Sequence, residues 1–147
     1  MITLAEKTAA TIATGIIWLD LVVLSERRTS ISEKIITSEL SGITPSSEDK
    51  NLEDKYWEIE KNHFLNSLMG VLIFLLTNLT LYDSNAFLAV VILYFIFAAS
   101  RVLYTLSGYF DSKFSQNIGN FISFLCIVGM LLTSVIMSII NINKRIM

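Results

Sequence analysis

Four long apolar runs follow one another along the chain and are separated by polar segments. They cover approximately residues 8–25, 62–82, 86–110 and 116–142. Each run approaches or exceeds the ~20 residues that an α-helix needs to cross the hydrocarbon core of a bilayer. The pattern predicts an all-α fold in which one domain, residues 1–147, forms a four-helix transmembrane bundle.

The first apolar run has the length of a secretory signal peptide. Asp20, however, lies late in this run, and a Glu-Arg-Arg sequence follows it. A cleavage site would instead be marked by small residues at this point. We therefore expect a retained membrane helix.

The links between the runs differ in length. A tight turn at 83–85 joins the second and third runs, and a short link at 111–113 joins the third and fourth, so we expect these neighbours to be antiparallel. Residues 26–61 are expected to form a long loop, which holds most of the charge and the only proline. Its 41–51 part is polar. Its 51–61 part is more helix-like and is a candidate extension of the second helix.

Composition and charge support the membrane interpretation and limit the possible functions. Hydrophobic residues make up 53% of the chain and charged residues 16%; the net charge of −2 gives no indication of a nucleic-acid partner. Lys and Arg number seven on the side of 26–61 and three on the opposite side. The positive-inside rule then places 26–61 in the cytoplasm. We expect an integral, multi-pass protein of the endoplasmic reticulum or a similar endomembrane in a eukaryote, or of the inner membrane in a bacterium.

Polar side chains inside the apolar runs are costly and therefore informative. With the predicted orientation they gather in the cytoplasmic half of the bilayer. Arg101 costs ~3 kcal/mol or more there unless it is paired, so it should face the bundle, an aqueous cleft or an anionic ligand. Spacings of three or four residues place Asn62 with Asn66, and Arg101 with Tyr104 and Thr105, on common helix faces. The polar candidates are Asp20, Asn62, His63, Asn66, Arg101, Tyr104, Thr105 and Tyr109.

Each of these residues also has a purely structural interpretation. Arg101 could pair with Asp20 and lock two helices together. His63 fits a solvated or capping group better than a metal ligand, since no partners lie at ligand spacing, and we expect no metal site. Tyr109, near the membrane edge, could be an interfacial anchor. The chain has no GxSxG, HExxH or glycine-rich phosphate loop, and Ser-His-Asp catalysis has little support.

Three short segments resemble the MAPEG family, the membrane-associated proteins in eicosanoid and glutathione metabolism. Residues 63–68 read His-Phe-Leu-Asn-Ser-Leu, similar to the His-Leu-Asn-x-Leu-Glu segment of the microsomal glutathione transferases. Residues 97–104 read Phe-Ala-Ala-Ser-Arg-Val-Leu-Tyr, which resembles the family's Phe-x-x-x-Arg-x-x-Tyr/His pattern. Residues 25–28, Ser-Glu-Arg-Arg, are similar to the Ser-x-Arg-Arg of the leukotriene synthase branch.

This resemblance implies a left-handed bundle assembled as a homotrimer, with glutathione bound between neighbouring subunits in the cytoplasmic half of the membrane. Arg101 and Arg28 (or Arg27) would hold glutathione carboxylates, which suit the fork of a guanidinium group. Asn66 would hydrogen-bond the amides of glutathione. The implied activity is that of a glutathione transferase or peroxidase, in which the thiolate attacks a lipophilic small molecule that arrives from the bilayer.

The chain also departs from the family pattern. Asn62 stands in place of a basic residue, and Met69 in place of a glutamate. Gly108 occupies the position of a second tyrosine, with Tyr109 one residue later. No arginine stands early in the fourth run, where the family uses one to stabilise the thiolate. Tyr104 or Tyr109 could donate a hydrogen bond to the thiolate instead, so these two are the candidate catalytic residues.

Three functional interpretations follow. The first is a MAPEG-type transferase or peroxidase with glutathione as co-substrate. The second is a non-catalytic member of the same fold that binds a lipid or assists another protein. The third is a small structural four-helix protein held together by an Asp20–Arg101 pair.

Overall fold

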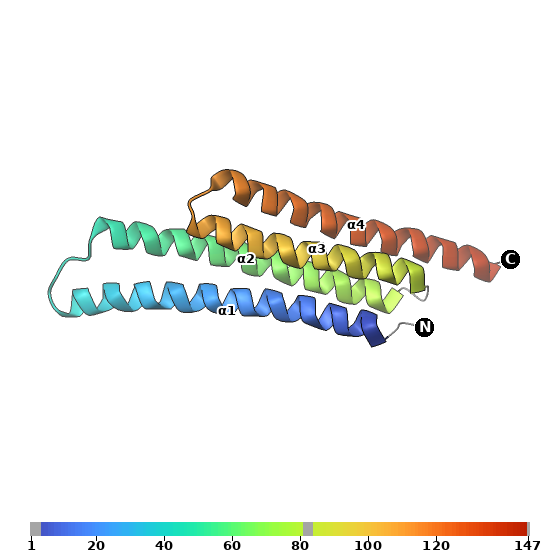
Figure 1. Cartoon of the computed structure of the whole chain (residues 1–147), viewed down its shortest axis with the longest axis horizontal. Helices are drawn as coiled ribbons and strands as arrows, with labels where there is room; N and C mark the ends of the chain where they lie inside the picture. The colour runs from blue at the N-terminus through green and yellow to red at the C-terminus, as the bar shows by residue number, and fades with distance from the viewer. Residues whose placement is uncertain (1–3, 81–83, 147) are drawn as a thin grey trace.

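The computed structural model describes residues 4–80 and 84–146, which form four α-helices. They are α1 (Leu4–Leu40), α2 (Ser47–Thr80), α3 (Ser84–Tyr109) and α4 (Lys113–Ile146). Each is long and apolar enough to cross a membrane, so the chain is an integral, multi-pass membrane protein. The helices lie side by side in an elongated bundle (Figure 1).

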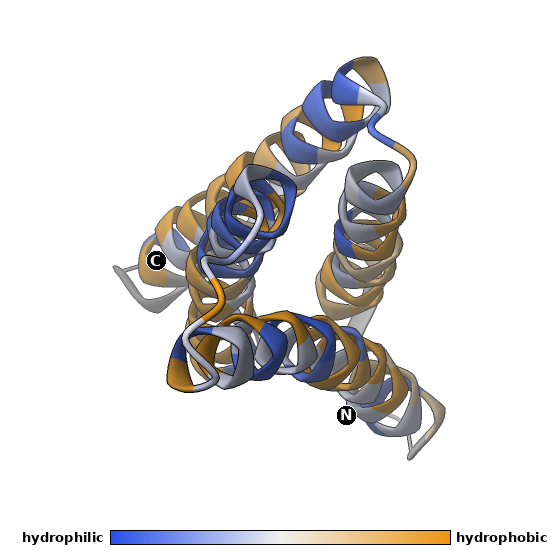
Figure 2. Cartoon of the chain, turned by 90° about the vertical axis from the view of Figure 1, so that its left-hand side faces the viewer, coloured by the Kyte–Doolittle hydropathy of each residue, from blue (hydrophilic) through white to orange (hydrophobic). Residues whose placement is uncertain are grey.

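Helices α1 and α2 are longer than their apolar runs. Hydropathy predicts helix ends near residues 25 and 62, whereas α1 continues to Leu40 and α2 begins at Ser47. The expected loop 26–61 is therefore helical except at residues 41–46, and the extension of the second helix through 51–61 is confirmed. Together the two extensions form a hairpin that reaches past the α3–α4 link (Figure 1). Figure 2, viewed from that end, shows hydrophilic residues concentrated in the hairpin.

Local capping explains why the hairpin turns where it does. Gly42 adopts a positive φ of 73°, and the Ile43 N–H donates to the Ser38 carbonyl, which closes α1 with a Schellman turn. The first turn of α2 is capped by Ser46, whose hydroxyl oxygen accepts the Asp49 N–H at 3.1 Å. Apolar residues indicate which part of a helix contacts lipid, whereas these capping residues determine where the helix ends.

The shorter links agree better with the sequence. Asp111 adopts a positive φ of 55° after α3, and the Ser112 hydroxyl oxygen accepts the Ser115 N–H at 3.4 Å at the start of α4. The predicted bounds 86–110 and 116–142 match α3 and α4 to within about one helical turn. Residues 81–83, which include the predicted end of the second run and part of the predicted tight turn, lie outside the described residues.

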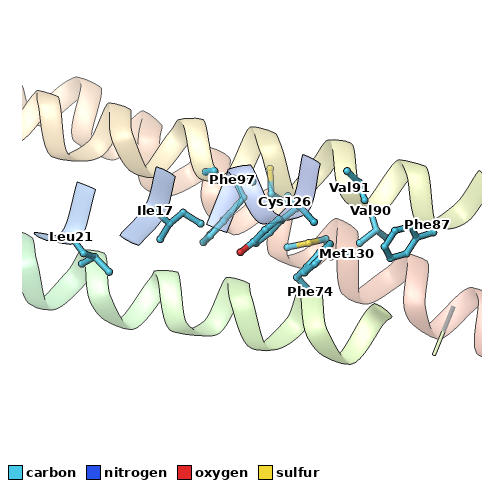
Figure 3. Close-up of a cluster of buried hydrophobic side chains, with 13 residues drawn as sticks. Ile17, Leu21, Phe74, Phe87, Val90, Val91, Phe97, Cys126 and Met130 are labelled. Carbon is cyan, nitrogen blue, oxygen red and sulfur yellow. The ribbon is translucent and has the colours of Figure 1, made fainter. Parts of the chain in front are cut away.

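Helices α2 and α3 each pack against the three other helices, whereas the described parts of α1 and α4 do not meet. In the apolar core the Tyr94 ring stacks on Phe74, with ring centroids 4.2 Å apart, and the Tyr94 hydroxyl lies 2.9 Å from that of Thr14. Figure 3 shows the surrounding core side chains, which include the free thiol of Cys126.

Gly119 allows α3 and α4 to approach closely. A Cβ at this position would lie 3.0 Å from the Ser100 carbonyl oxygen and 3.2 Å from the Tyr104 backbone nitrogen. One turn along α4, the buried hydroxyls of Ser100 and Ser123 lie 2.7 Å apart. Small residues at such crossings are typical of helix pairs in membranes. The crossing places the first turns of α4 beside the Arg101–Tyr104 segment of α3.

We expect Gly119→Leu to destabilise the bundle by ~1–3 kcal/mol, the usual cost of overpacking. The new side chain would meet backbone atoms of α3, which cannot rotate out of the way. Thermal unfolding of the detergent-purified protein measures the effect. Gly15→Leu is the matched control, because no atom lies within 4 Å of its added Cβ. Equal stability of the two variants would contradict the close α3–α4 contact.

Candidate functional site

Arg101 lies wholly inside the bundle, with a side chain that is 0% exposed. Its Nη1 donates to Asn120 Oδ1 on α4 at 2.9 Å, and its guanidinium carbon lies 4.5 Å from the centre of the Tyr104 ring. Within the described chain, its Nε and Nη2 have no hydrogen-bond partner. These two atoms form one edge of the guanidinium group, and such an edge can donate to both oxygens of a carboxylate at once.

The interpretation that Arg101 forms an ion pair with Asp20 is wrong. Asp20 Oδ2 instead accepts hydrogen bonds from His63 Nε2 at 2.6 Å and Thr105 Oγ1 at 2.8 Å. Arg101 forms no ion pair with any carboxylate of the residues that the structure describes. Two nearer donors on α2 and α3 occupy the Asp20 oxygen, so the Arg101 charge lacks a direct counterion.

His63 is buried at 0% exposure, so its interpretation as a solvated group is wrong. Its Nδ1 lies 2.9 Å from the Ser67 hydroxyl. When the Nε2–H tautomer of His63 donates to Asp20, Nδ1 of the neutral ring accepts a hydrogen bond from the Ser67 hydroxyl. Because α2 continues through residue 63 as regular helix, this face turns toward α1 and α3 although it lies at the edge of the apolar run. The resulting network, Thr105–Asp20–His63–Ser67, joins three helices.

Ser67, His63 and Asp20 are the residue types of a Ser-His-Asp catalytic triad, but the site lacks an oxyanion hole. Ser67 lies in the interior of α2, where backbone N–H groups are bonded within the helix. Such N–H groups cannot form an oxyanion hole, which acyl transfer requires. The network therefore holds α1, α2 and α3 together.

The two asparagines of α2 join the Arg101 side of the bundle. Asn66 Nδ2 donates to the Asn62 carbonyl oxygen at 3.0 Å and also contacts the Asn62 side-chain oxygen. The Tyr104 phenol lies close enough to the side chains of Asn62 and Asn120 to interact with both. Four of the predicted site residues, Asn62, Asn66, Arg101 and Tyr104, thus form one continuous group between α2, α3 and α4. We call this group, with Asn120, the Arg101 cluster.

A cavity of about 310 Å³ opens beside Tyr104, between α2, α4 and the α3–α4 link. Ile59 and Tyr104 provide its apolar and aromatic surface. Its polar walls carry two amines, two carboxylates and two amides: Lys55, Lys113, Glu58, Asp111, Gln116 and Asn117. The cavity therefore offers hydrogen-bonding groups of both charges at the polar end of the Arg101 cluster.

Gly108 lies where α3 meets the side chains of Ile59 on α2 and Gln116 on α4. A Cβ at this position would lie 2.6 Å from Ile59 Cδ1 and 2.9 Å from Gln116 Nε2. A tyrosine here would collide with both side chains, which line the cavity. The glycine leaves Tyr104 as the aromatic residue on the cavity wall.

Arg27, Arg28 and Tyr109 lie in a separate cluster. The Arg27 guanidinium carbon lies 5.8 Å and 5.2 Å from the centres of the Tyr56 and Tyr109 rings. Arg28 forms an ion pair with Glu60 at 2.5 Å. The Tyr109 hydroxyl is buried and has no partner within the described chain. These three predicted residues lie on or against the α1–α2 hairpin and are not joined to Arg101.

Sequence reasoning missed Asn120 and the role of Ser67. A signal for Asn120 was present, since Gln116, Asn120 and Ser123 recur at spacings of four and three and mark a polar face on α4. In residues 4–80 and 84–146, no three His, Cys, Asp or Glu side chains come together to hold a metal ion. Comparison with protein-family models, curated proteins and solved structures gives no match.

We expect Asp20→Leu to lower the free energy of unfolding by ~1–3 kcal/mol, because His63 and Thr105 lose their buried acceptor. Adding His63→Leu should restore part of the loss, since both partners then leave together. Unfolding in mixed detergent micelles measures both effects. Asp54→Leu, at an exposed position, is the control and should change stability little. Strict additivity of Asp20→Leu and His63→Leu would argue against the contact.

Proposed function

We propose that the chain is a MAPEG-type membrane glutathione transferase or peroxidase that conjugates or reduces lipophilic compounds. The observation that carries this proposal is the free Nε/Nη2 edge of Arg101, a fully buried cation without a direct counterion. The resemblance of residues 63–68 and 97–104 to the family supplies the identity of the ligand. The proposed ligand, glutathione, carries two carboxylates that match this edge.

A buried guanidinium edge without a partner favours an anionic ligand for an electrostatic reason. Moving a charge from water into the protein interior has a large free-energy cost, and only hydrogen bonds and an opposite charge reduce this cost. Asn120 and the face of Tyr104 supply part of this compensation. A carboxylate at the open edge would add two charge-assisted hydrogen bonds, which are about twice as strong as neutral ones. Arg101 is thus suited to hold a ligand carboxylate.

The neighbouring groups support a peptide-like ligand. Asn66 and Asn62 on α2, with Gln116 and Asn117 on the cavity wall, can donate to and accept from amide groups. Tyr104 lies between Arg101 and the cavity, so its hydroxyl is the proposed donor to the glutathione thiolate. A hydrogen bond to the thiolate lowers the thiol pKa and makes the nucleophile available at neutral pH. The thiolate, whose proton passes to water, then forms a C–S bond to the electrophilic atom of a lipophilic substrate, and the leaving group (chloride in an aryl chloride) departs with its electron pair.

Arg27, Arg28 and Tyr109 enter the proposal through assembly. In one subunit they have partners of their own on the hairpin. We propose a left-handed bundle that assembles as a homotrimer, in which the hairpin of one subunit lies beside the Arg101 cluster of the next. Arg28 or Arg27 would then reach the second carboxylate of glutathione. The proposed setting is an endomembrane in a eukaryote or the inner membrane in a bacterium, with the hairpin in the cytoplasm.

One observation favours a non-catalytic member of the same fold as the second candidate. The first two turns of α4 present Gln116, Asn117 and Asn120 near Tyr104, and no arginine. Tyr104 also already interacts with two amide side chains. In such a protein the Arg101 cluster would bind an anionic lipid or peptide without activating a thiol.

We expect millimolar glutathione to raise the melting temperature of the wild-type protein and not that of Arg101→Gln, because binding to the native state stabilises it. Glutathione diethyl ester, which lacks both free carboxylates, should have no effect on either protein. Lys7→Gln, at an exposed cation far from the cluster, should retain the wild-type response. Absence of any shift in the wild type would contradict glutathione binding.

Tyr104→Phe separates the two candidates. In the transferase, it should reduce conjugation of glutathione to an electron-poor aryl chloride about 10- to 100-fold, the contribution of one hydrogen bond to a charged group. The glutathione-induced thermal shift should remain, since Arg101 is intact. If wild-type protein shows the shift but no conjugation or peroxide reduction, the non-catalytic candidate is favoured.

A further inference from the structure

A groove on the outer face of α1 and α2 has a separate set of residues from the Arg101 cluster. It has a volume of about 410 Å³. On α1 its walls include Trp18, Val22 and Ser25; on α2 they include Trp57, Lys61 and Phe64. These residues recur at spacings of three and four, so each helix contributes one continuous face. We call this feature the α1–α2 groove.

The groove changes from polar to apolar along its length. Lys61 and Trp57 lie toward the hydrophilic hairpin, and Trp18 and Phe64 lie on the apolar part of the helices. A narrower cavity of about 40 Å³ shares Trp18 and Phe64 with the groove and continues to Leu68 and Val71. A molecule that fits this gradient has a polar head and a hydrocarbon chain, and its chain lies among the side chains of α1 and α2.

The charged residues at the polar end of the α1–α2 groove, its polar rim, indicate which charge a bound head group carries. Glu60 on the rim is neutralised by its ion pair with Arg28 at 2.5 Å. Lys61 is exposed and forms no ion pair with any carboxylate of the described residues. The rim therefore presents one uncompensated positive charge beside an acidic residue. A head group with a single negative charge complements this lysine.

From this arrangement we propose that the α1–α2 groove binds a long-chain carboxylate, such as a fatty acid. The carboxylate pairs with the Lys61 ammonium at the membrane edge, and Trp57 flanks it. The hydrocarbon chain runs past Trp18 and Phe64 toward Leu68. This binding site depends on neither Arg101 nor Tyr104, so it holds whether or not the chain binds glutathione.

The two tryptophans of the chain both line the groove and provide the measurement. Bromine quenches indole fluorescence at short range, so the protein in phosphatidylcholine nanodiscs is titrated with 9,10-dibromostearate at a pH that ionises it. The neutral probe is the corresponding dibromostearyl alcohol, and dibrominated phosphatidylcholine reports contact with bulk lipid. Trp57→Phe and Trp18→Phe assign the quenching to each indole.

We expect saturable quenching by the carboxylate at lower concentration than by the alcohol, and stronger quenching of Trp18 than of Trp57. Lys61→Gln should weaken carboxylate binding about two- to fivefold, the scale of an exposed ion pair, and leave alcohol binding unchanged. Lys113→Gln, which removes an exposed cation at the start of α4, is the matched control and should have no effect on binding of either probe. Ser25→Leu, which fills the groove, should abolish the saturable component.

Two results would overturn the proposal. If carboxylate and alcohol quench equally and in proportion to their membrane fraction, the groove contacts only bulk lipid. If none of the three brominated probes quenches either tryptophan, the groove is covered, as it would be by a second copy of the chain. Both results are measured on the wild-type protein, so neither depends on whether a variant folds.

Discussion

The bundle depends on the satisfaction of polar groups that its own sequence places inside a membrane. Hydrocarbon offers no hydrogen bonds, so each buried donor and acceptor must find a partner within the protein, and an unpaired group costs several kcal/mol. Asp20 meets this constraint by accepting from His63 on α2 and Thr105 on α3. Arg101 meets it only in part, through Asn120 on α4 and the Tyr104 ring. These two centres tie all four helices to α3.

The Asp20 network and Arg101 differ in how completely their polar groups are hydrogen-bonded. This difference separates polar residues with a structural role from those suited to bind a ligand. The Asp20 network uses both nitrogens of His63 and the hydroxyls of Thr105 and Ser67, so no donor in it faces open space. Such a network stabilises helix packing and offers little to a ligand. Arg101 keeps an edge without a hydrogen-bond partner, and Tyr104, whose ring it contacts, lines the cavity. A charge that is held in place by its neighbours and has unpaired donors is preorganised for binding.

Sequence reasoning found the helices because lipid contact imposes a strong compositional signal, but it misplaced the ends of α1 and α2. Hydropathy falls where the chain leaves the membrane, whereas helix ends depend on groups such as Gly42 and Ser46. For the site, spacing on a helix face correctly grouped Asn62 with Asn66 and Arg101 with Tyr104. Spacing carries no information about which helices meet, so the Asp20–His63 contact could not be predicted, and the polar face that contains Asn120 could not be assigned to Arg101.

Helix α2 has one face packed against the other helices and another face exposed on the outside of the bundle. The face carrying Asn62, His63 and Asn66 turns toward the other helices, where each side chain has a hydrogen-bond partner. The face carrying Lys61 and Phe64 is exposed and borders the α1–α2 groove. A helix rotates its side chains by 100° per residue, so neighbouring positions such as Lys61 and Asn62 serve different surfaces. Slippage of α2 by a single residue would bring Lys61 toward the interior and expose the Asn62 amide to lipid. Both exchanges are strongly unfavourable in hydrocarbon, and the polar network therefore sets the rotation of α2 and, with it, the position of the groove.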